Sequence, residues 1–206
     1  MNLTIILQYL SYFSAFIPLL AVIIFWYKKR FGFDTRANLI GIYILFLFCA
    51  QLTMLILAVN GIHNLYVLRI FLIIEILILS YFLLSFNLTS KYITLFLAIM
   101  LSTAILIVDL IWGIPSSGPV QSIMVEAIVI TLIGMFTIFS IKIDKEYQYS
   151  FFYFTFAIIF ASLNNLLGVG FIELAPELSF NIQALVNTTA NLIFARGFYI
   201  IIKDNS

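Results

Sequence analysis

Five ionisable side chains lie inside long apolar runs, where a charge is costly and is a functional hypothesis by default. The deepest is Glu75, about ten residues into its run, or roughly 15 Å at the helical rise of about 1.5 Å per residue. This side chain is too short to reach the headgroups from that depth, so it must be protonated, paired or facing water. The other four are Arg69, Asp109, Glu126 and Arg196.

Uncharged polar side chains gather in the same half of the apolar runs as most of these charges. Asn187 and Asn191 are one helical turn apart and therefore share a face. A bundle that is polar in one half only would hold a pocket open to that side. The expected ligand-binding residues are Glu75, Arg69, Asp109, Glu126, Gln51, Asn164, Asn165, Asn187 and Asn191. The alternative is structural, because amides in membrane bundles often bond between helices at about 0.6 kcal/mol each.

Two specific contacts are expected within this set. Arg69 and Asp109 lie at matching depths on consecutive runs, which favours an ion pair, although both are shallow enough to reach the headgroups. Glu75 should turn inward, away from lipid, and be mainly neutral. Its expected hydrogen-bond partner is an amide such as Asn187 or Asn191.

The residue types exclude several reactions. Every lysine lies outside the apolar runs, so no Schiff base can form within the membrane. One histidine, His63, and one cysteine, Cys49, cannot build a His/Cys zinc site. No Gly-rich phosphate loop or nucleophile elbow is present. We therefore expect no enzyme, no catalytic residue, no metal and no cofactor.

The elements that must position these side chains are transmembrane helices. The chain has 206 residues, of which 64% are hydrophobic and 9% charged, with a mean hydropathy of +1.18. A helix needs about 20 mainly apolar residues to cross the hydrocarbon layer. Such runs fall at 4–27, 37–60, 65–87, 92–112, 120–141, 149–171 and 182–202. This predicts an all-α bundle of seven transmembrane helices, forming one domain over 1–206.

Short loops predict that consecutive helices are antiparallel neighbours. Pro18, near the middle of the first run, should kink it. Eight lysines and arginines lie after the first, third, fifth and seventh runs, and none lies in the loops on the other side. The positive-inside rule then places the N-terminus outside and the C-terminus in the cytoplasm. We expect a multi-pass protein of a cell membrane, in a bacterial inner membrane.

Two function classes fit this organisation. The first is a binding or sensing module that recognises a small polar ligand in the outer half, or a partner in the membrane. Its signal would pass to a membrane or cytoplasmic partner. The second is a small-solute transporter or channel with a parallel 3+1+3 helix arrangement. Aligning the sequence with itself at an offset of 111 residues supports the transporter, because residues 50–55 then align with residues 161–166 and some of the aligned residues are identical. The lipid bilayer is the expected partner in both cases, and nucleic acid is excluded.

The chain resembles small bacterial seven-span membrane proteins of unassigned role. The resemblance is carried by Asn60-Gly61-Ile62-His63-Asn64-Leu65, by Ile74-Glu75-Ile76 and by the asparagines of the last two runs. By architecture, the chain is also similar to the seven-span sensor modules of bacterial signalling proteins. Neither resemblance brings a catalytic motif with it.

Overall fold

The computed structural model describes residues 3–29, 34–60, 65–112, 120–143, 146–171 and 176–203. These residues form helices and their short connections, and no strand occurs among them. The helical class predicted from the composition is therefore confirmed. The elements are α1 (Leu3–Ser14), α2 (Phe16–Lys29), α3 (Thr35–Val59), α4 (Leu65–Leu84), α5 (Lys91–Trp112), α6 (Val120–Ser140), the 3-10 helix η1 (Glu146–Gln148), α7 (Tyr149–Phe171) and α8 (Pro176–Lys203).

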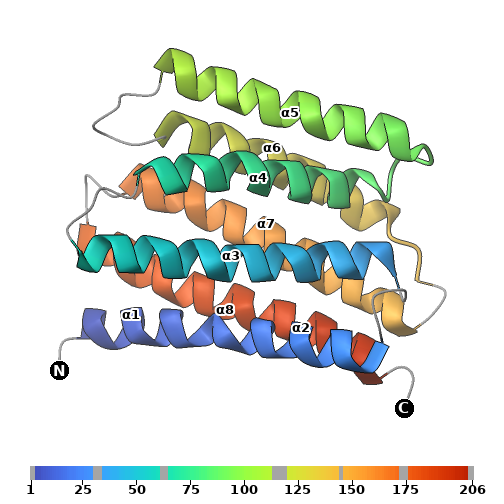
Figure 1. Ribbon diagram of the computed structural model, residues 1–206, viewed down its shortest axis with the longest axis horizontal. Coiled ribbons are helices and arrows are strands. Elements are labelled where there is room, and N and C mark those ends of the chain that lie inside the picture. The colour runs from blue at the N-terminus through green and yellow to red at the C-terminus, as the bar shows by residue number, and fades with distance from the viewer. Residues whose placement is uncertain are drawn as a thin grey trace.

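The helices lie side by side along the long axis of the molecule, and each long helix reverses the direction of the one before (Figure 1). Every consecutive pair from α2 to α8 packs together, as predicted. Contacts also close a ring in the order α2, α3, α4, α6, α7, α8 and back to α2. The remaining long helix, α5, packs outside the ring against α4 and α6.

Within the described ranges, six helices are long and apolar enough to cross a membrane. The candidate spans are Thr35–Met54, Val67–Leu84, Lys91–Val108, Ser122–Ser140, Tyr149–Leu167 and Glu177–Lys203. The last helix begins at Pro176, six residues before the predicted run. Proline suits the first helical position, where its missing N–H has no intrahelical partner. Hydropathy alone missed this polar first turn.

The first predicted run is two helices, not one. α1 has 12 residues and α2 has 14, with a turn at Ala15 between them. They lie end to end along one side of the bundle (Figure 1). Pro18 causes the break, because a proline cannot donate to the carbonyl four residues earlier and its ring clashes with that carbonyl. The predicted kink is therefore present as a break in the helix, about one turn before Pro18.

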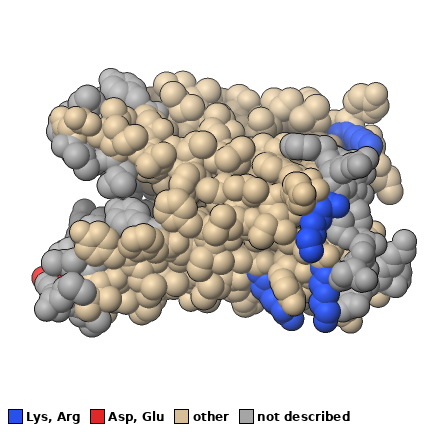
Figure 2. Space-filling view, turned by 60° about the horizontal axis from the view of Figure 1, so that its bottom comes forward, with Lys and Arg blue, Asp and Glu red and all other residues tan. Residues whose placement is uncertain are grey.

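The exposed lysines gather at one end of the bundle, which we call the basic end (Figure 2). Arg69, half-buried near the start of α4, is not part of this group. Because the helices alternate in direction, the C-terminal ends of α2, α4, α6 and α8 all lie there. Exposed lysines at this end are Lys28, Lys91, Lys142 and Lys203, with Arg36 half-buried among them. At the opposite end, Glu177 is an exposed acidic residue.

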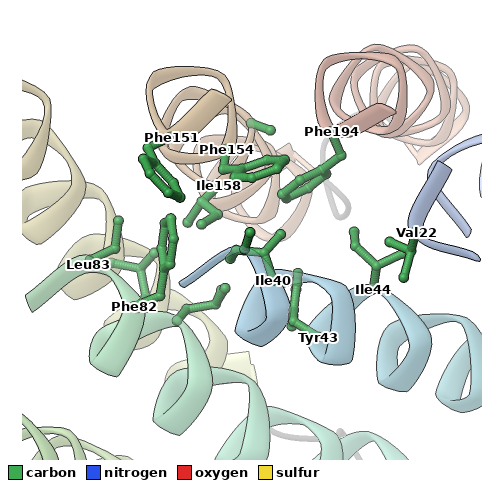
Figure 3. Close-up of a cluster of buried hydrophobic side chains, with 14 of the residues drawn as sticks. Val22, Ile40, Tyr43, Ile44, Phe82, Leu83, Phe151, Phe154, Ile158 and Phe194 are labelled. Carbon is green, nitrogen blue, oxygen red and sulfur yellow. The ribbon is translucent and has the colours of Figure 1, made fainter. Parts of the chain in front are cut away.

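Phenylalanine rings fill the interior of the ring of helices in the half nearest the basic end. We call this the aromatic cluster: Phe25, Phe82, Phe151, Phe154, Phe194 and Phe198, all at most 3% exposed. The centroids of Phe154 and Phe198 are 4.7 Å apart, and those of Phe25 and Phe198 are 5.4 Å apart. Figure 3 shows Phe154 and Phe194 facing Ile40, Tyr43 and Ile44 across the interior, with Phe151 on the side of Phe82 and Leu83. This half of the interior is therefore packed with apolar side chains.

Candidate functional site: a polar cavity inside the helix ring

A cavity of about 210 Å³ lies inside the ring, on the far side of Tyr43 and Phe194 from most of the aromatic cluster. We call it the polar cavity. Five helices line it. On α3, α4, α7 and α8 the lining residues recur at three- and four-residue spacing and so share one face of each helix, and α6 contributes one residue. They are Tyr43, Leu47, Gln51 and Met54 of α3; Leu68, Phe71, Leu72 and Glu75 of α4; Ile123 of α6; Ala161 and Asn165 of α7; and Asn187, Ala190, Asn191 and Phe194 of α8.

Five of the nine residues expected to bind a ligand line this cavity together: Gln51, Glu75, Asn165, Asn187 and Asn191. They come from four helices and are separated by up to 140 positions in the chain. The expectation that Glu75 turns inward, toward the amides of the last two helices, is confirmed. The side chain is half-buried rather than exposed to lipid.

The hydrogen-bond partner of Glu75 differs from the expected one. The hydroxyl of Tyr43 donates to Glu75 Oε1 at 2.6 Å, and neither Asn187 nor Asn191 bonds to this carboxyl. The reason is geometric: α3 and α4 pack directly together, whereas the cavity separates α4 from α8. A long tyrosine on the neighbouring helix therefore reaches the carboxyl. Among the described residues this bond engages one of the two carboxyl oxygens.

A second carboxyl lies behind the cavity wall. Glu126 of α6 is 4% exposed and does not line the cavity, which corrects its assignment as a direct ligand-binding residue. It is close enough to Glu75 and Tyr43 to interact with both electrostatically. Its Oε2 has no hydrogen-bond partner among the described residues. The site therefore combines two acidic groups with few compensating donors.

Two of the amides tie the helices together. Asn164 is 2% exposed and its Nδ2 donates to Asn187 Oδ1 at 3.3 Å, so it positions a lining residue without lining the cavity itself. Asn191 Nδ2 donates to Ser14 Oγ at 2.9 Å, at the end of α1. The structural alternative for the asparagines thus holds for these bonds. Gln51, Asn165, the Nδ2 of Asn187 and the Oδ1 of Asn191 are left available to the cavity.

The cavity is closed toward the basic end and becomes more exposed toward the opposite end. Along α8, exposure rises from 8% at Asn191 to an exposed Asn187 one turn nearer the opposite end. Along α3 it rises from 3% at Tyr43 to a half-buried Gln51. Toward the basic end, Tyr43 and Phe194 are in ring contact, and Phe194 stacks on Phe154.

Arg69, which is expected to pair with Asp109, lies outside the lining of this cavity. Arg69 is half-buried on α4 and does not line it, because the six-residue separation from Glu75 turns it about 120° around the helix. Asp109 belongs to α5, which packs on α4, but its side chain lies outside the described part of the structure. The pair stays a prediction. The assignment of Arg69 as a direct ligand of the cavity is therefore corrected, and that of Asp109 stays a prediction.

Tyr43 and Ser14 are the polar residues that sequence reasoning missed. Tyr43 could have been found from the sequence, because it lies eight residues before Gln51, a predicted ligand-binding residue. With Leu47 between them, the three are spaced by four residues and share one helix face. Ser14 could not have been found in this way, because the residue of α1 that faces α8 depends on how the two helices pack.

The site thus offers a carboxyl, several amide groups and aromatic rings around a small, closed-ended space. Among the described residues, no group of three or more His, Cys, Asp or Glu side chains could hold a metal ion. Comparisons with protein-family models, with curated proteins and with solved structures found no match.

Proposed function

We propose that this multi-pass membrane protein crosses the bilayer seven times, with its N-terminus outside and its C-terminus in the cytoplasm of a bacterial cell. Six long apolar helices support six crossings. The seventh is the end-to-end pair α1 and α2, whose 12 and 14 residues together match one span. The gathering of lysine and arginine at one end supports the orientation.

Within that frame, the protein is a binding or sensing module that recognises a small ligand in the polar cavity. The observation that carries this proposal is the convergence of Glu75, Gln51 and three asparagines on one cavity, closed at the basic end by aromatic rings. Its volume of about 210 Å³ lies below the roughly 300–1,000 Å³ of drug-sized sites, so the ligand is small. The signal that results from ligand binding would be passed to a membrane or cytoplasmic signalling partner.

The ligand that fits best carries a positive charge. No described lysine or arginine lines the cavity, whereas Glu75 does and Glu126 lies behind it. One oxygen of Glu75 is free of hydrogen bonds to described residues. The rings of Tyr43, Phe71 and Phe194 supply faces that attract a cation. A small ammonium compound would therefore match both the acidic and the aromatic groups. Glu75 is expected to be mainly neutral in the empty cavity, and a cation bound beside it favours the ionised carboxylate.

Thermal unfolding of the protein in nanodiscs tests this binding. Ethanolamine and tetramethylammonium should raise the unfolding temperature of the wild type, whereas acetate should not. Glu75→Gln keeps an acceptor for Tyr43 but removes the charge, so it should abolish the shift. Lys142→Gln, at the basic end, is the control and should keep it. An equal shift in Glu75→Gln would contradict the assignment of Glu75.

A small-solute transporter is the competing function. It would need a second route through the aromatic cluster, where six phenylalanines are at most 3% exposed. A sensor needs only the one opening. Uptake of radiolabelled ethanolamine into proteoliposomes separates the two: the sensor shows binding without uptake, and saturable uptake that Glu75→Gln abolishes would establish transport instead.

A further inference from the structure

A second cavity, of about 340 Å³, lies at the basic end between the start of α3, the end of α4 and the start of α5. We call it the Arg36 pocket. Two cations line it, Arg36 and Lys91, together with the hydroxyl-bearing Thr35, Ser85 and Thr89. Neither cation takes part in the polar cavity. This pocket is therefore a separate site with the opposite charge preference.

Arg36 is fixed in place by neutral groups. Its Nε donates to Ser85 Oγ at 3.1 Å and its Nη2 donates to the Ser85 carbonyl at 2.8 Å. Its guanidinium carbon lies 4.2 Å from the centroid of the Phe86 ring. Phe86 in turn contacts Phe82 and Phe151 of the aromatic cluster. The guanidinium is thus held in one orientation by a rigid part of the fold.

The charge of this arginine is not balanced by an ion pair within the described residues. The two hydrogen bonds to Ser85 use two of the five N–H donors of a guanidinium and leave three. The nearby carboxylate of Asp34 is directed to the helix start, where Oδ1 accepts from the backbone N–H of Arg36 at 2.7 Å. Lys91 is exposed and brings a second positive charge to the rim. With two cationic side chains and one carboxylate among these residues, the net charge around the pocket is positive.

The connection between α4 and α5, which forms one wall, is also tied down. Asn87 Nδ2 donates to Thr137 Oγ1 at 3.2 Å, and Ser140 Oγ donates to Asn87 Oδ1. Thr35 and Thr89 on the rim are exposed, so their hydroxyls can face a ligand. Leu39 and Leu88 supply apolar lining. The pocket therefore pairs fixed anion-binding groups with an apolar side.

We propose that the Arg36 pocket binds the phosphate group of an anionic phospholipid. Basic pockets between transmembrane helices, at the level of the headgroups, suit this ligand. The remaining N–H donors of Arg36 and the ammonium of Lys91 bind the phosphate oxygens, while Thr35 and Thr89 donate from the rim. Leu39 and Leu88 contact the glycerol and the first methylenes. A soluble phosphate ester presents the same oxygens without the acyl chains.

The test measures unfolding temperature in phosphatidylcholine nanodiscs with a rising fraction of phosphatidylglycerol. The wild type should be stabilised at a low fraction. Lys91→Gln, which changes an exposed side chain, should need about fivefold more phosphatidylglycerol for half of the effect, and Arg36→Gln/Lys91→Gln more still. The matched control, Lys142→Gln/Lys203→Gln, loses two charges at the same end but none from the pocket, and should behave like the wild type.

Equal losses in the two double variants would overturn the proposal, because they would reflect overall charge alone. If Arg36→Gln/Lys91→Gln does not fold, Lys91→Gln decides, and an unchanged lipid dependence overturns the proposal. A further arm adds glycerol 3-phosphate to pure phosphatidylcholine nanodiscs at constant ionic strength. Stabilisation there, with none from phosphatidylglycerol, would overturn the lipid as the ligand and assign the pocket to a soluble phosphate ester.

Discussion

Tyr43 and Glu75 show how one hydrogen bond positions a carboxyl inside an apolar bundle. The tyrosine is 3% exposed and its hydroxyl reaches Glu75 Oε1 at 2.6 Å. A buried carboxyl without a donor is costly, and removing its partner leaves the full desolvation cost of the group. The bond leaves the second oxygen of Glu75 for the cavity. The pair therefore belongs both to the packing of α3 on α4 and to the proposed ligand site.

Tyr43→Phe should lower the free energy of unfolding, because it removes this donor. Bonds between transmembrane helices contribute about 0.6 kcal/mol on average and about 1.7 at most. The loss should shrink in the Glu75→Leu background, where no acceptor remains, and a double-mutant cycle in nanodiscs measures the difference. Tyr149→Phe, at an exposed tyrosine, is the control. Equal costs of Tyr43→Phe in both backgrounds would contradict the pairing.

At the scale of single helices, periodicity predicted which side of a helix faces the cavity. It was less successful in predicting which residues of other helices these side chains contact. Asn187, Asn191 and Glu75 were placed inward from their spacing and depth, and the structure agrees. Glu126 is also a glutamate within an apolar run, yet it packs behind the wall, since its direction depends on how α6 is rotated against α4. The break at Ala15 follows from Pro18, which the sequence shows. The Ser14–Asn191 bond instead depends on how α1 packs on α8, which one sequence does not encode locally.

Glycines set how closely α6, α7 and α8 approach. A Cβ on Gly134 would lie 2.6 Å from Ile159 Cγ1, and a Cβ on Gly197 would overlap the ring of Phe154. Both neighbours are buried, so neither can move away cheaply. Small residues at helix contacts allow such close approach in membranes.

Gly197→Ala and Gly134→Ala should each lower the free energy of unfolding by about 1–3 kcal/mol, as overpacking does. Unfolding in nanodiscs measures this cost. Ala104→Val adds more volume at an exposed position of α5 and should change it by less than about 0.5 kcal/mol. A Gly197→Ala variant as stable as the wild type would show that α7 and α8 do not pack this closely.

The whole molecule is polarised along its long axis. The polar cavity occupies the middle of the ring and faces one end, the aromatic cluster fills the other half, and the lysines and arginines cover the basic end. The helical bundle and the clustering of charge followed from composition and loop charges. The closed order of helices around the ring did not, because several orders satisfy seven antiparallel spans with short loops.

Cysteine labelling in intact cells should report this polarity directly. Cys49 is exposed on α3, so the background is Cys49→Ala. Ser117→Cys and Glu177→Cys should react with a membrane-impermeant maleimide added outside, and Lys91→Cys and Lys142→Cys should react only after the membrane is opened. The reverse pattern would invert the proposed orientation and place the open side of the polar cavity in the cytoplasm.

The most direct test of the polar cavity is the reaction of cysteines on its wall with charged methanethiosulfonates. In the Cys49→Ala background, Gln51→Cys and Asn187→Cys should react with reagents added on the side of the membrane opposite the basic end. Ile44→Cys, at a buried position, should not react. The cationic reagent should react faster than the anionic one, after correction for their rates with a free thiol, and Glu75→Gln should remove that preference. Unreactive Gln51→Cys and Asn187→Cys, or equal rates for the two reagents in the presence of Glu75, would contradict an acidic cavity that receives a small cation.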